Sequence, residues 1–112
     1  MTATKTSRNM HIARPVEADT TTALTLALTN SDGIVSMDNA SANVVTIPTN
    51  ATVAFELGNQ VDVIQMGVGV TSVTAAAGVT LNGVVAGTTA MTLQYGGATL
   101  VKHATDTWSV LG

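Results

Sequence analysis

The side chains that could take part in chemistry are few and far apart in this sequence. The chain has two histidines, His11 and His103, and no cysteine. A protein metal site needs several His, Cys or carboxylate ligands that converge, and neither histidine has such partners at ligand spacing. The lack of cysteine also excludes a disulfide framework and a thiol nucleophile. We therefore predict no metal site and no other cofactor.

Three further patterns are similar to functional motifs but are incomplete. Glu56 and Asp62 would suit an acid–base pair, yet no histidine, serine nucleophile or glycine-rich cradle accompanies them. Residues 67–71 (GVGVT) are similar to a phosphate loop but lack its lysine and its following helix. Residues 50–52 (NAT) fit a glycosylation pattern, which matters only on a secretory route. We interpret the two carboxylates as surface groups and predict that the protein is not an enzyme.

Aromatic side chains are also scarce: the chain has one Phe, one Trp and one Tyr. We expect Trp108 to anchor the core from a closing strand, and Phe55 and Leu57 to close one end of that core. Tyr95 lies beside two glycines and is the better candidate for an exposed ligand contact.

Charge divides the chain into two parts. Lys5, Arg8 and Arg14 precede all seven acidic residues, and the next basic residue is Lys102. Residues 1–18 show no period of 2 or 3.6, so we predict an extended basic arm ahead of a weakly acidic β-domain at 19–112. A tail without a role is the alternative. Met10 and Ile12 favour a docking arm, whose expected contact residues are Lys5, Arg8, Met10, Ile12 and Arg14.

The composition indicates what such an arm would bind. Three charges without interleaved aromatics are a poor nucleic-acid site, and phosphate would repel the acidic domain. An acidic groove on another protein is the more economical partner. No apolar stretch is long enough to span a membrane, and no signal peptide is visible at the start.

Few residues are charged, 10% against the usual level of about 25%. The apolar residues are mostly small and branched, which makes a thin core. Both features favour burial of surface between copies of the chain.

Alternation of apolar and polar residues predicts β-strands throughout the domain. In residues 22–28 it places Leu24, Leu26 and Leu28 on one face, and in residues 61–66 it places Val61, Val63 and Gln65 together. Turn residues separate the segments about every 8–12 residues, which is typical of an all-β sandwich or barrel. We expect a compact all-β sandwich or barrel-like domain without helices. The other expected strands are 34–37, 44–47, 70–74, 79–81, 91–94, 98–103 and 107–111.

A series of short segments carries a resemblance to a known group of proteins. They are 26–28 (LAL), 37–41 (MDNAS), 45–48 (VTIP), 51–55 (ATVAF), 61–65 (VDVIQ), 78–82 (GVTLN), 98–102 (ATLVK) and 106–112 (DTWSVLG). In this order they resemble a small β-domain of structural proteins of tailed bacteriophages, found in tail fibres and related virion components. The resemblance implies a β-structured virion protein, commonly trimeric, without catalytic residues.

In tail proteins this domain usually stands among others on a long chain with a shaft, whereas here it follows a short arm. We therefore expect a homotrimeric capsid decoration (cement) protein that binds the major capsid protein, assembled in the host cytoplasm and located on the capsid surface of the virion. A tail-fibre or tail-tip module that binds a receptor, such as a host surface glycan, is the alternative. An unrelated carbohydrate-binding β-domain is a third reading, although it would need several exposed aromatics.

Overall fold

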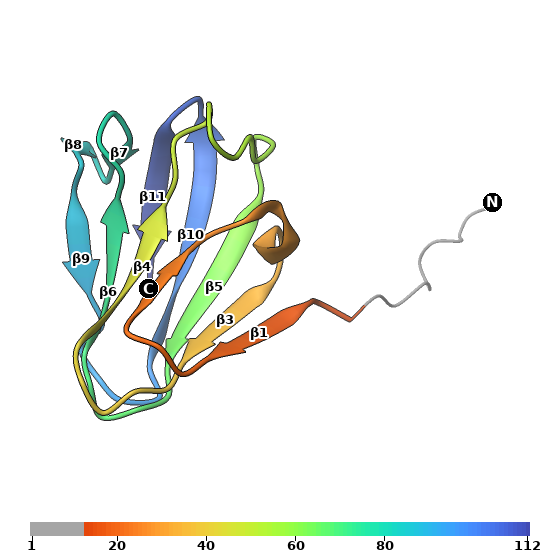
Figure 1. Ribbon diagram of the computed structural model, residues 1–112. Coiled ribbons are helices and arrows are strands. Elements are labelled where there is room, and N and C mark those ends of the chain that lie inside the picture. Colours follow the sequence, from red (N-terminus) through yellow and green to blue (C-terminus); the bar gives the residue numbers. More distant parts are fainter. Residues whose placement is uncertain (1–12) are drawn as a thin grey trace.

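The computed structural model describes residues 13–112, which form two β-sheets packed face to face (Figure 1). A short 3₁₀ helix, η2 (Leu28–Asn30), follows β2, and residues 13–112 contain no α-helix. The all-β prediction is therefore confirmed, in the form of a sandwich. In spatial order, the larger sheet consists of β1 (Val16–Asp19), β3 (Ile34–Met37), β5 (Gln60–Gln65), β10 (Gly97–Ala104), β11 (Thr107–Leu111), β7 (Thr80–Leu81) and β8 (Val84–Val85). The smaller sheet consists of β2 (Ala23–Thr25), β4 (Asn43–Ile47), β6 (Thr71–Ala75) and β9 (Thr88–Ala90).

The first six strands wind as three successive coils, each of which has one strand in the larger sheet and one in the smaller sheet. The chain alternates between the sheets, so that β1, β3 and β5 lie side by side and parallel in one sheet. Likewise β2, β4 and β6 lie side by side and parallel in the other. The later strands close the structure differently, because β9 pairs antiparallel with β6, and β10 pairs antiparallel with both β5 and β11.

Most of the expected strands overlap observed ones, namely β2 to β7, β10 and β11. The strand expected at 91–94 is wrong, because these residues form a loop that carries the chain from one sheet to the other. Leu28 was expected on the same strand face as Leu26, but it lies on η2 and is 57% exposed, whereas Leu26 is buried. The very short strands β8 and β9 have no clear alternation and were not expected.

The core consists of small branched side chains around one aromatic pair. Val61 and Val63 are buried as expected, and Gln65 is buried beside them. Trp108 is buried and meets Phe55 edge to face, with ring centroids 5.4 Å apart, so its expected anchoring role is confirmed. Leu57, expected to help close the core, is instead exposed.

Strand β1 corrects the boundary of the predicted arm. Val16 to Ala18 pair in parallel with β3, so a boundary at residue 18 falls inside a strand. β1 is an edge strand whose Val16 is 64% exposed. Backbone hydrogen bonding rather than a buried side-chain face holds it, which is why alternation gave no signal there.

Successive coils come into backbone contact at the corner that joins the two sheets. The amide of Gly69 donates to Asn39 O at 2.9 Å, and the amide of Asn43 donates to Val70 O at 3.0 Å. A Cβ on Gly67 would lie 2.5 Å from the backbone of Asn39, and one on Gly69 would be closer still to Ser41 O. Glycine is required at both positions because the neighbouring backbone leaves no room for a side chain.

Buried polar side chains brace the same corner from inside. Gln65 Nε2 donates to Gly67 O at 3.1 Å, while its Oε1 accepts the amide of Thr71 at 3.1 Å. Thr71 Oγ1 in turn donates to Asn43 Oδ1 at 2.6 Å. These bonds satisfy polar groups whose burial would otherwise be costly.

We predict that Gly69→Ala destabilises the domain by about 1–3 kcal/mol, since the added methyl group forces two coils apart. Urea unfolding followed by Trp108 fluorescence measures the change. Val68→Ala, on the exposed side of the same turn, is the matched control and should change stability far less. Equal stability of Gly69→Ala and the control would show that the coils are not held at this separation.

Candidate functional site

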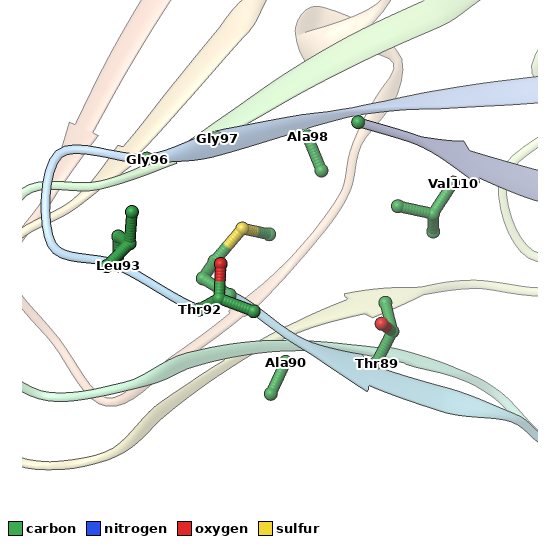
Figure 2. Close-up of a pocket in the computed structure, with 10 residues that line it drawn as sticks. Thr89, Ala90, Thr92, Leu93, Gly96, Gly97, Ala98 and Val110 are labelled. Carbon is green, nitrogen blue, oxygen red and sulfur yellow. The ribbon is translucent and has the colours of Figure 1, made fainter.

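A small recess opens between β9 with its following loop and the start of β10 (Figure 2). Its volume is about 110 Å³, and Thr89, Leu93, Ala98 and Val110 are among its lining residues. The only side-chain polar groups in this lining are threonine hydroxyls, from Thr89 and Thr92. The recess therefore suits a small apolar group and offers no titratable side chain for catalysis.

The candidate chemical residues do not converge in the part of the chain that the structure describes. Residues 13–112 hold no group of three or more His, Asp or Glu side chains placed to bind a metal ion. His103 is exposed and its Nε2 lies 2.9 Å from Ser109 Oγ. Asp62 forms an ion pair with Arg14. Nor is any helix in this range long and apolar enough to cross a membrane.

The arm residues Lys5, Arg8, Met10 and Ile12 lie outside the described residues. Arg14 lies within them, and it fastens the first coil to the rest of the larger sheet. Its Nη1 lies 2.6 Å from Asp62 Oδ2, its Nη2 donates to Gly33 O at 2.9 Å and its Nε donates to Asp32 O at 2.8 Å.

Asp62 stands at the centre of this contact. Its Oδ1 also accepts a hydrogen bond from Thr99 Oγ1 on β10, so the bonds of Arg14 and Asp62 reach from the start of β1 to β10. Partial burial raises the pKa of Asp62, but the hydrogen bonds from Thr99 and Arg14 and the positive charge of Arg14 outweigh it and hold the pKa below its usual value.

Lys102 is the most unusual polar group of the domain. It points inward from β10, is 2% exposed, and its Nζ donates to Asn50 Oδ1 and to Phe55 O, both at 2.6 Å. Sequence reasoning treated it only as an isolated charge. The alternation of Leu100 with Lys102 could have revealed its inward direction, because a strand points every second side chain to the same face.

One end of the sandwich carries five exposed large apolar side chains. Here the loop after β9 touches the turn after β5, since the amide of Tyr95 donates to Gln65 O at 2.6 Å. Tyr95 is 69% exposed, as expected for a candidate contact residue. We call this surface the apolar end, and its residues are Met66, Val68, Val70, Leu93 and Tyr95.

Comparisons with protein-family models, with curated proteins and with solved structures found no match to this chain.

The ion pair of Asp62 predicts a dependence of stability on pH. Because its folded-state pKa lies below the usual value, the pair stabilises the domain at neutral pH, and that stability is lost as the pH falls through the lowered pKa. Both partners are partly exposed, at 40% and 30%, so we expect Asp62→Asn to cost about 0.2–1 kcal/mol at neutral pH.

Urea unfolding at a series of pH values tests this expectation. Wild type and Asp62→Asn should converge in acid, and high salt should narrow their difference at neutral pH. Asp38→Asn, at an exposed carboxylate on the corner, is the control and should follow wild type. A difference between wild type and Asp62→Asn that persists unchanged into acid would contradict the assignment.

Proposed function

We propose that this protein is a homotrimeric decoration protein that binds the major capsid protein on the outer surface of a bacteriophage capsid. The distribution of basic groups carries the proposal. Of the four basic residues, Lys102 is buried and Arg14 is bonded within its own domain. Lys5 and Arg8 thus precede a domain that contains all seven acidic residues, which suits an arm that binds an acidic groove on another protein.

The outward face of the smaller sheet supports assembly into an oligomer. On the smaller sheet, Thr25, Thr46, Thr74 and Thr88 form one row across four strands, and Ala23, Val44, Ser72 and Ala90 form the next. These residues are short and uncharged, so burying them against a second copy desolvates no charge. The resemblance to virion β-domains, which are commonly trimeric, favours three copies.

Charge alone is too weak to hold such a protein permanently on a particle. Exposed ion pairs contribute about 0.2–1 kcal/mol each, and salt screens them over about 8 Å at physiological strength. Burial of Met10 and Ile12 would add roughly 1.5–3 kcal/mol for each fully buried side chain. Three arms on one trimer would further raise the effective concentration of each contact.

The apolar end favours a second candidate function. Tyr95 and Leu93 lie together on an exposed tip, and such patches often mark interaction sites. A tail-tip module that binds a receptor through this end would use Tyr95, whereas a decoration protein that binds through its arm would not. Tyr95→Ala should therefore leave capsid binding unchanged under the leading proposal.

We predict that the purified protein is a trimer, with three times the 11.3 kDa mass of the chain in light scattering. Its melting temperature should rise with protein concentration, because dissociation accompanies unfolding of an obligate oligomer. A monomer that is stable at micromolar concentration would refute the proposed assembly.

We predict that deletion of residues 1–12 leaves a folded oligomer that no longer binds capsids. The deletion keeps Arg14 and β1, which belong to the domain. Replacing Lys5 and Arg8 by Gln should weaken binding and reduce its salt dependence without abolishing it. Co-sedimentation with capsids that lack the protein measures each variant.

Arg14→Gln is the matched control for this series. It removes one positive charge, as each arm substitution does. Its main effect should be a lower melting temperature, with little loss of capsid occupancy. Capsid occupancy at the wild-type level after deletion of residues 1–12 would show that the domain, and not the arm, makes the contact.

A further inference from the structure

Lys102 and Asn50 meet in an arrangement that can react. Lys102 Nζ lies 2.6 Å from Asn50 Oδ1, so it also lies close to the carbonyl carbon that bears this oxygen. A second acceptor, Phe55 O, holds the same nitrogen at 2.6 Å. The main chain of Asn50 is fixed in turn, because its amide donates to Asp106 Oδ1 at 2.7 Å. The amine and the amide are therefore both held in place before any reaction.

The surroundings of Lys102 are those of a hydrophobic core. Its cross-strand partner is Trp108, whose ring packs against Phe55. Both acceptors of the amine are neutral, and within residues 13–112 the one ion pair is that of Arg14 with Asp62. A buried ammonium without a carboxylate is costly in such an environment. A reaction that converts it into a neutral amide would remove this cost.

We propose that Lys102 and Asn50 form an intramolecular isopeptide bond. Nζ of the neutral amine attacks Cγ of Asn50, the Nζ–Cγ bond forms and the Cγ–Nδ2 bond breaks. One proton of the amine moves to Nδ2, and ammonia leaves. The reaction consumes no oxidant, reductant or cofactor. Asn50 is only half-buried, so the ammonia has a path to solvent.

The bond would join the two sheets covalently. Asn50 lies just after β4 of the smaller sheet, and Lys102 lies on β10 of the larger one. A link between residues 50 and 102 closes a long loop of the chain and limits the unfolded ensemble, as a disulfide does. Such a link suits a thin core without cysteine. The inference does not depend on the proposed function, because it concerns the domain alone.

The intact mass of the denatured full-length protein tests the proposal. We expect wild type to weigh less than its sequence by one ammonia, after purification or after prolonged incubation at mildly alkaline pH. Lys102→Met and Asn50→Ala should keep the full mass of their sequences under the same conditions. A wild-type mass equal to that of the sequence throughout would overturn the proposal.

Trypsin digestion of denatured wild type is the second measurement and needs no variant to fold. Trypsin cleaves after a free lysine, so unlinked protein releases the peptide 103–112, whereas linked protein does not. Loss of ammonia at Asn82–Gly83 would change the intact mass similarly but would leave cleavage after Lys102 intact. Loss of ammonia together with full release of peptide 103–112 would therefore also overturn the proposal.

Discussion

The close approach of successive coils at one corner is the constraint on which the rest of the structure depends. The turn after β5 lies directly against the turn after β3, and only glycine fits at positions 67 and 69. This contact brings β5 beside β3 and β6 beside β4, each in parallel. The inward residues of both sheets then face one another, and the core of small branched side chains follows. A substitution in the turn after β5 affects both sheets, because this turn leads from β5 in the larger sheet to β6 in the smaller one.

Two polar contacts join segments that are far apart in the sequence, and they differ in character. The contact of Arg14 with Asp62 lies on the partly exposed outer face, so solvent and salt weaken it. The contact of Lys102 with Asn50 and Phe55 lies between the sheets, where removal of one partner leaves buried polar groups unsatisfied. The first holds Arg14, just before β1, against the larger sheet, and the second ties β10 to the loop after β4.

The sequence alone predicted the strands that have one buried face, because alternation reports burial. It missed the winding, since in-register partners such as Val16, Ile34 and Asp62 lie 18 and then 28 residues apart and form no regular repeat. It assigned Arg14 to the arm because its partner Asp62 is 48 residues away. Lys102 was left unexamined because a lysine is expected in solvent, although its place in the alternation pointed inward.

The position of the protein on intact particles tests the central claim most directly. Electron cryo-microscopy of the phage should show the two-sheet domain in groups of three on the outside of the capsid, with the side that carries Arg14 facing the shell. The apolar end with Tyr95 should lie free of that contact. Density for the domain at the tail tip, or on the capsid with Tyr95 against the shell and Arg14 pointing to solvent, would contradict the proposed role of the arm.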